Sequence, residues 1–423
     1  MATERPVPTS GAALLNAIPP IPARSLTAVL GALTAFGALS IDMYLPALAT
    51  IGRNIGADSV SMQTTLSVFF IGLAIGQLIY GPLSDRFGRL MPLYAGLCLY
   101  VVASIGCALA TSVEGLWTGR LAQALGACAG LVISRAAVRD LFDPMQAARV
   151  FSRLMLVMGL APVLAPLIGG QLLLVGSWRL IFWTLAVIGL LTMIAVRAIL
   201  PETHRGPRTT LHPVAVFKGF VAILRDHRFL WHALTGAFAS ASLLTYIVAS
   251  PAVLIEHYGV SPQRFGLFFG ANAVGLVAAA QLNAHWLRKQ TPQRILRMST
   301  IALFAAGVAV AITALTGFGG VYGIAGAWFC QLTSMGFVGA NAAAGALKDQ
   351  GARAGSASAV LGSLQFGLGA VSGAVCSALA AMHWVSSPLH ATGVVTLAIT
   401  AAAFAANCAS AAGEGTEARL SAA

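Results

Sequence analysis

The sequence predicts an all-α membrane protein with twelve transmembrane helices in two six-helix halves. Three observations lead to this fold class. Of the 423 residues, 58% are hydrophobic and 9% are charged, whereas a soluble domain carries about 25% charged residues. Apolar runs of roughly the 20 residues needed to cross a bilayer recur along the chain. One long polar connection, residues 201–228, separates six such runs from six more.

The apolar runs and the connections between them define the predicted organisation. The predicted transmembrane segments are 27–50, 62–83, 90–111, 115–137, 148–174, 178–200, 230–255, 264–287, 294–317, 320–346, 355–382 and 388–411. The period-two alternation of an outer-membrane barrel is absent. We therefore expect five parts: a cytoplasmic tail over 1–26, a first half over 27–200, a central cytoplasmic loop over 201–228, a second half over 229–411 and a cytoplasmic tail over 412–423.

The basic residues predict that both termini are cytoplasmic. If the N-terminus lies inside, nearly all lysines and arginines fall in inner loops or at inner helix ends, and only Arg53, Arg179 and Arg264 fall outside. This bias explains the net charge of +12 without nucleic acid as a partner. The six cysteines lie in apolar segments and the histidines show no metal-ligand spacing, so we predict no disulfide framework, metal site or cofactor.

The first predicted span contains the stretch GALSIDMYLPALATIG, residues 37–52, with Asp42 as the only acid inside any predicted span. Arg120, in the fourth span, is the only basic side chain well inside one. At 1.5 Å per residue, Asp42 lies about 22 Å from the inner end of its helix and Arg120 about 8 Å from the outer end of its own. Both therefore fall in the outer third of a core about 30 Å thick.

This placement suggests that Asp42 binds a proton, with Arg120 as a coupling partner. Burial raises the pKa of a carboxyl group and a nearby cation lowers it, and alternating access changes both terms. Two other interpretations stay open. Asp42 could form a fixed bond to Arg120 or to the backbone that only orients the first helix, or it could contact a cationic substrate directly.

The connection between the second and third spans reads GPLSDRFGRLMPL, residues 81–93. Two glycines are expected to bracket a tight turn, and Asp85 is placed to face a helix N-terminus or an arginine. This string resembles the signature loop of the major facilitator superfamily. The resemblance implies that the loop latches the two halves together in the outward-facing state. The residues to which it assigns this switching role are Gly81, Asp85, Arg86, Gly88 and Arg89. The corresponding connection of the second half, 283–297, keeps only the basic residues.

The fifth span, LVMGLAPVLAPLIGGQLL over 156–173, contains Pro162 and Pro166 one turn apart, followed by Gly169 and Gly170. Prolines leave backbone carbonyls unpaired and bend a helix, and glycines let a neighbour approach closely. The pattern resembles the antiporter motif G-P-x-x-G-G of the same superfamily, with Ala165 in place of the glycine before the proline. The resemblance implies an exporter and a switching role for these four residues. A kinked helix that serves packing alone is the other interpretation.

Further strings resemble the Bcr/CflA group of that superfamily. They are DMYLPAL, RLAQALGACAG, AVRDLF, APLIGG, SWRLIFW, SPAVLIEHYGVSP and AGSASAVLGSLQFGLGAVSGA, spread from about residue 40 to 375. Members are drug:proton antiporters of bacterial inner membranes, which export bicyclomycin, sulfonamides and chloramphenicol-type drugs. The resemblance implies the major facilitator fold and functional roles for the first-helix acid, Asp42, and the fourth-helix arginine, Arg120.

In that fold the first, fourth, seventh and tenth helices line a central cavity. The candidate substrate-binding residues are Tyr44, Gln123, Tyr246, Gln331 and Asn341, with Asn272 and Gln365 as weaker ones. For each of them, helix packing or an interhelical hydrogen bond is an equally open role. An apolar wall with a few hydrogen-bonding groups suits small lipophilic compounds.

These expectations combine into a proton-coupled multidrug efflux antiporter that works as a monomer in the inner membrane, with the proton gradient as its energy source. An exporter of a metabolite, such as an amino acid or a siderophore, is the main alternative. A passive channel and a non-transporting receptor are others. No nucleotide-binding loop, nucleophile elbow or H-E-x-x-H motif occurs, so no catalytic residue and no enzyme activity is predicted.

Overall fold

The computed structural model describes residues 23–204, 213–382 and 387–422. Twelve helices in these ranges are long and apolar enough to cross a membrane, which confirms the predicted fold class. The first half contains α2 (Ala23–Asp42), η1 (Leu45–Ala47), α3 (Leu48–Ile55), α4 (Ser59–Phe87), α5 (Leu90–Leu109), α6 (Val113–Leu141), α7 (Pro144–Val175) and α8 (Arg179–Ile199). The second half contains α10 (His227–Pro251), η2 (Ala252–His257), α11 (Pro262–Trp286), α12 (Pro292–Thr316), α13 (Gly320–Leu347), η3 (Gly351–Arg353), α14 (Ala354–Ala381) and α15 (Pro388–Ala422).

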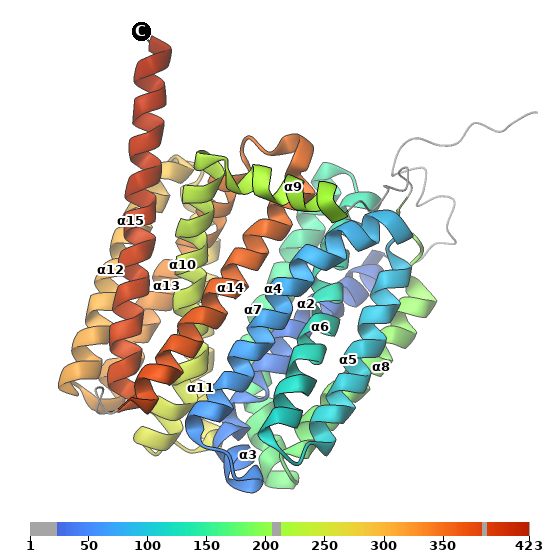
Figure 1. Cartoon of the computed structure of the whole chain (residues 1–423), viewed down its shortest axis with the longest axis vertical. Coiled ribbons are helices and arrows are strands. Elements are labelled where there is room, and N and C mark those ends of the chain that lie inside the picture. Colours follow the sequence, from blue (N-terminus) through green and yellow to red (C-terminus); the bar gives the residue numbers. More distant parts are fainter. Residues whose placement is uncertain (1–22, 205–212, 383–386, 423) are drawn as a thin grey trace, which may run out of the picture.

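The two halves meet along two seams. In one, α4 packs along α14, and in the other α7 packs along α11 (Figure 1). Within the first half, small residues bring the helices close: a side chain at Gly72 would meet Ala124, and one at Gly76 would meet Cys128. Such small residues at helix interfaces let backbones approach in a membrane, where burial of apolar surface gives no drive for association.

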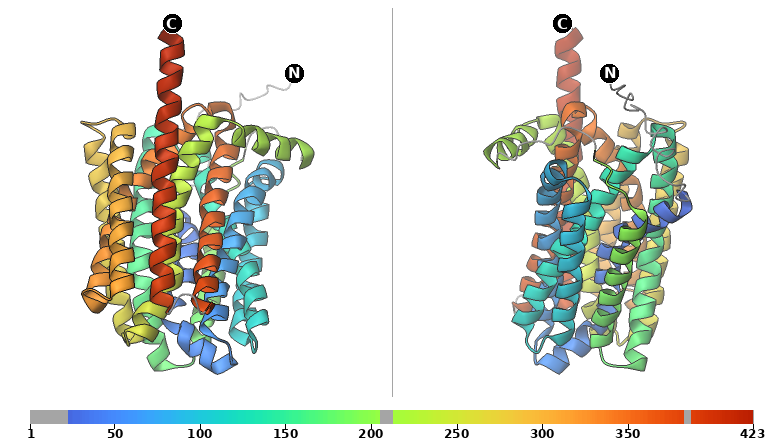
Figure 2. Two further views of the ribbon diagram at one scale, coloured as in Figure 1. Left: turned by 60° about the vertical axis from the view of Figure 1, so that its left-hand side comes forward. Right: turned by 90° about the vertical axis from the view of Figure 1, so that its right-hand side faces the viewer.

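The polar connection contains a helix that the sequence did not predict. α9 (Pro213–Leu224) lies across one end of the bundle in both figures. Its Ile223 is buried in a cluster with Phe229 and Ala357 of the second half. We call the bundle end that carries α9 the α9 face, and the opposite end, which carries α3, the α3 face (Figures 1 and 2).

The first helix of each half is interrupted near the α3 face. α2 ends at Asp42, because Pro46 has no N–H to donate to the Asp42 carbonyl four residues earlier. The chain continues through the 3-10 turn η1 before α3 begins. In the second half, α10 passes after Pro251 into η2, a π-helical turn. Irregular turns of this kind often lie at functional sites, and in transporters broken helices in corresponding positions of the two halves point to the binding site.

Candidate functional site

Arg120 lies at the centre of the first half and is fully buried. Its guanidinium is sandwiched between two aromatic rings, with Cζ 4.1 Å from the centroid of Phe69 and 4.6 Å from that of Tyr44. Nη1 donates to the Ser40 carbonyl at 2.9 Å and to Gln123 Oε1 at 2.7 Å. Its Nε and Nη2 find no hydrogen-bond partner among the described residues. Arg120 therefore binds the last turn of α2, while its buried Nε and Nη2 donors stay unpaired among the described residues.

Asp42 ends that turn and is the only acidic residue that is buried in the described part of the chain. No ion pair joins it to Arg120: the ion pairs among the described residues involve Arg89 and Arg228 only. The arginine contacts the backbone two residues before the acid instead, through the Ser40 carbonyl. The turn η1, which follows Asp42 after two residues, packs against α10 and α11, so the end of α2 lies beside the second half.

The second half contributes an aromatic cluster near this acid. Tyr246 stacks on Phe269 with ring centroids 5.4 Å apart and meets the edge of Trp328 at 5.0 Å. The Tyr246 hydroxyl accepts from Asn272 Nδ2 at 2.9 Å. The indole N–H of Trp328 and Oε1 of Gln331 lack partners among the described residues. Buried polar groups are rarely left unpaired, so this cluster holds one donor and one acceptor whose hydrogen bonds are not made within the described residues.

The structure divides the five candidate substrate-binding residues into three places. Tyr44 and Gln123 belong to the shell of Arg120, where Tyr44 also bonds Thr65 at 2.9 Å. Tyr246 lies in the aromatic cluster, and Gln331, one turn along α13 from Trp328, donates to the Ser242 carbonyl at 3.2 Å. Asn341 lies apart from both groups. It bonds Asn283 of α11 at 2.7 Å and lines a separate cavity at the α9 face.

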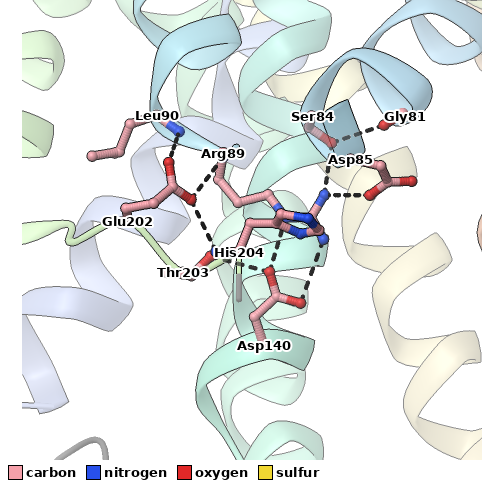
Figure 3. A network of polar contacts seen from close by, with 9 residues as sticks. All are labelled: Gly81, Ser84, Asp85, Arg89, Leu90, Asp140, Glu202, Thr203 and His204. Carbon is pink, nitrogen blue, oxygen red and sulfur yellow. Dashed lines mark hydrogen bonds and ion pairs between the residues drawn. The ribbon is translucent and has the colours of Figure 1, made fainter. Parts of the chain in front are cut away.

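A second polar network surrounds Arg89 at the connection between α4 and α5 (Figure 3). Its guanidinium donates to Asp85 at 2.6 Å, to Ser84 at 2.8 Å and, through Nε, to Asp140 of α6 at 2.8 Å. Burial lowers the pKa of this guanidinium, but the two carboxylates outweigh burial and hold the pKa above its ordinary value. Arg89 thus clamps α4, α5 and α6 together within the first half.

Glu202 supplies the other part of the network, from the chain that follows α8. Its Oε1 accepts from the Arg89 backbone N–H at 2.8 Å, and its Oε2 accepts from that of Leu90 at 3.1 Å, so it caps the start of α5. Burial raises the pKa of this carboxyl, but the N–H groups of His204, Arg89 and Leu90 bring it below the ordinary value. Gly88 has φ +84° and a side chain there would strike Glu202. Only glycine suits this position.

Sequence reasoning missed Glu202 and did not single out Asp140. The available signal was an acid directly after the sixth span, in the string PETHR. The expectation that Gly81 and Gly88 bracket a tight turn was wrong: α4 continues to Phe87, so Gly81 lies inside the helix, and Gly88 and Arg89 connect α4 to α5. Arg86 takes no part in the network, and its guanidinium lies over the ring of Phe87.

The glycine pair of α7 fits against two different neighbours. A side chain on Gly169 would overlap the carbonyl oxygen of Met43, next to the α2 break. One on Gly170 would lie 2.9 Å from the carbonyl oxygen of Pro262, at the start of α11 in the second half. The helix is continuous through Pro162 and Pro166. At the α3 face, α7 therefore packs tightly against both halves.

At the α9 face the halves leave a cavity of about 280 Å³ between α4 and α6 on one side and the start of α14 on the other. Asp85 lines it and has half of its side chain, 51%, exposed. The carboxylate is bonded to Arg89 and to no group of α14. The predicted latch between the halves is therefore not engaged in this structure.

Twelve membrane-length helices in two packed halves, with the first helix of each half interrupted, are typical of a polytopic membrane transporter. The family model described as Major Facilitator Superfamily matches residues 30–377. The chain therefore belongs to the major facilitator superfamily.

Individual relatives narrow the comparison. The chain is 34% identical over 386 residues to the MFS-type transporter YdgK of Bacillus subtilis. This alignment covers 90% of this chain and 94% of that protein. It is 31% identical over 357 residues to the bicyclomycin resistance protein homolog of Haemophilus influenzae, covering 83% and 88%. It is 33% identical over 294 residues to a chloramphenicol resistance protein of Pseudomonas aeruginosa, covering 69% of each. These names are consistent with the Bcr/CflA group.

Solved structures agree on the fold. The crystal structure of a D-xylose–proton symporter superposes with a TM-score of 0.72 at 14% identity, covering 90% of this chain and 97% of that one. At this identity the likeness concerns the fold alone.

Proposed function

We propose that this protein is a proton-coupled efflux antiporter that exports small lipophilic organic compounds across a bacterial inner membrane. The drug-resistance names of its relatives support the substrate class. The observation that carries the proton coupling is Asp42, a buried acid at a helix break with no ion-pair partner among the described residues. An isolated carboxylate in a membrane interior costs several kcal/mol, and a bound proton removes that cost.

Orientation follows from charge. Arg139, near the end of α6, lines the cavity at the α9 face, and Arg149 and Arg153 lie in the first three turns of α7, which follows α6 directly. We therefore place the α9 face in the cytoplasm together with both termini. The structure then corresponds to the state that is closed toward the outside and has its cavity on the cytoplasmic side. In the opposite state Asp85 would reach the uncapped start of α14 and latch the halves.

In the proposed cycle a compound enters from the α9 face and reaches the aromatic cluster around Tyr246. Its hydrogen-bonding groups meet the free indole N–H of Trp328 and Oε1 of Gln331. Its arrival close to Asp42 favours release of the proton toward the cytoplasm, and rebinding of a proton from the outside resets the carrier. Arg120 positions the acid, because it holds the Ser40 carbonyl in the same helical turn.

The test is drug-induced proton movement in everted membrane vesicles, followed with a pH-sensitive dye. Chloramphenicol or another compound of a drug panel should release protons through the wild type and not through Asp42→Asn. Asp58→Asn is the matched control, since Asp58 is an exposed acid that caps α4 through the Ser61 N–H and asparagine caps equally well.

Other outcomes contradict parts of the proposal. Equal coupled flux through wild type and Asp42→Asn would make this acid structural. A folded protein that answers metabolites but no drug would support the metabolite exporter. Equilibration of a substrate without accumulation against its gradient would indicate a channel.

A further inference from the structure

The cavity at the α9 face contains positive charge that its acidic residue does not neutralise. Arg135 and Arg139 of α6 line it one helical turn apart. Arg135 donates through Nε to the Leu131 carbonyl at 3.2 Å, and Arg139 makes no hydrogen bond or ion pair with any described residue. Like charges at this spacing repel each other on a helix. The one acid of the lining, Asp85, is bonded to Arg89.

The opposite wall belongs to the second half and adds further donors. It is formed by Gly355, Ser356 and Ser358 at the start of α14. This helix has 28 residues, no side-chain cap and no acid in its first turn. The N-terminal end of such a helix carries a partial positive charge.

Gln77 of α4 gives an independent indication of a ligand. It lines the same cavity, is only 2% exposed, and its Nε2 has no hydrogen-bond partner in the described part of the chain. A side chain on Gly362 of α14 would lie 3.0 Å from its Oε1, so the amide is held between the two halves. Apart from Asp85, which is bonded to Arg89, the charged side chains of the lining are the arginines Arg89, Arg135 and Arg139.

We propose that this cavity binds an anionic group of phosphate or carboxylate size. Arg135 and Arg139 hold it from the first half, and the start of α14 holds it from the second. Because such a ligand contacts both halves, its binding favours the state in which the cavity exists and opposes the approach of Asp85 to α14. No step of this proposal uses Asp42, a proton or a drug, so it stands or falls separately from drug export.

An anionic group of this kind can come from two sources. One is the phosphate of an anionic phospholipid headgroup at the inner leaflet, and the other is a soluble anion from the cytoplasm. The exposed arginines Arg149 and Arg153 of α7 provide a comparison, since they have the same spacing of four residues but do not line the cavity. Their presence on the same face is explained by membrane orientation alone.

The first experiment measures thermal unfolding of the purified chain in neutral detergent, with inorganic phosphate added at constant ionic strength. Phosphate should raise the melting temperature of the wild type in a saturable way. Arg135→Gln/Arg139→Gln should lose this response, while its melting temperature without phosphate should equal or exceed that of the wild type because a repulsion is removed. Arg149→Gln/Arg153→Gln should keep the response. Loss of the response in both double variants, or no response in the wild type, would overturn the proposal.

The second experiment separates the two sources. Ser356→Cys is labelled with a water-soluble maleimide in nanodiscs of phosphatidylcholine, with or without phosphatidylglycerol, and the unsubstituted chain corrects for the native cysteines. Protection by phosphate alone assigns the site to soluble anions. Protection by phosphatidylglycerol assigns it to a lipid headgroup. Either protection should disappear when Arg135 and Arg139 are both glutamine. No protection by either probe would contradict the proposal.

Discussion

Gly169 and Gly170 are neighbours in the chain, yet the close contacts that they permit have different partners. Gly169 meets the Met43 carbonyl within the first half, and Gly170 meets the Pro262 carbonyl across the seam. If the halves separate at the α3 face during transport, the first contact persists through the cycle and the second is broken in each turnover. The same substitution at these two positions should therefore change different properties.

We expect Gly169→Ala to lower thermal stability, because overpacking against a backbone atom costs about 1–3 kcal/mol. Gly170→Ala should destabilise the state that is closed at the α3 face by a similar free energy. The population should therefore shift toward the state that is open at that face. The measurements are the melting temperature and the labelling of Ser377→Cys, which is 2% exposed in α14. Gly106→Ala is the control, since nothing lies within 4 Å of a side chain there. Identical effects of the two variants would contradict this assignment.

Sequence reasoning at the residue scale singled out Asp42 and Arg120, but it did not predict that Arg120 binds the Ser40 carbonyl. Depth along a helix can be counted from the sequence, so their common level was predictable. Rotation about the helix axis and the choice of a backbone acceptor depend on packing by Phe69 and Tyr44. The Ser40 carbonyl is free to accept because Tyr44, four residues later, donates to Ile41 instead. That local choice follows from the helix break.

The element scale is best seen in the cap of α5. Four N–H groups at the start of a helix lack partners within it, and Glu202 satisfies two of them from 112 and 113 residues away. The negative charge of the carboxylate also interacts favourably with the positive end of the α5 helix dipole. The link ties the exit of the sixth span to the entry of the third.

Glu202→Gln should lower the stability of the chain by about 0.5–2 kcal/mol at neutral pH, the range for loss of a helix N-cap. Because the pKa of Glu202 is lowered in the folded chain, its contribution is fully present above the ordinary glutamate pKa of about 4.3. It is lost as pH falls through the lower folded-state value. The difference between variant and wild type in thermal unfolding should thus shrink in strong acid. Glu256→Gln, at an exposed acid of η2, is the control variant.

Helix existence was predictable at this scale and helix ends were not. Composition and run length identify each span, because a bilayer requires about 20 apolar residues. They do not reveal that α4 continues through Pro82 to Phe87, since Ser84 and Asp85 of its last turn are bonded to Arg89, which in turn binds Asp140 of α6. α9 escaped notice because its apolar residues, flanked by polar ones, are too few to span a membrane.

At the scale of the whole molecule, α4 and α14 pack closely along part of their length and leave a cavity at the α9 face. A side chain at Gly373 of α14 would lie 2.9 Å from Ser67 Oγ of α4. Two cysteines at such positions have the short separation of Cβ atoms that a disulfide requires.

Ser67→Cys/Gly373→Cys should form a disulfide on oxidation and stop transport, because the halves can then no longer separate along this seam. Reduction should restore activity, and each single variant should be insensitive to oxidant. The measurements are mobility of the protein on a non-reducing gel after a cut in the central connection, and drug transport in vesicles. Full activity of the cross-linked protein would show that this seam does not open.

The described ends of the central connection contact different halves at the α9 face. Glu202 binds its beginning to the first half at Arg89 and Leu90, and α9 packs into the second half through Phe220 and Ile223. Removing the Glu202 carboxylate from the start of α5 would loosen the turn at Gly88 from which Arg89 reaches Asp85. A single acid after the sixth span therefore supports the position of the arginine that holds Asp85 beside the cavity.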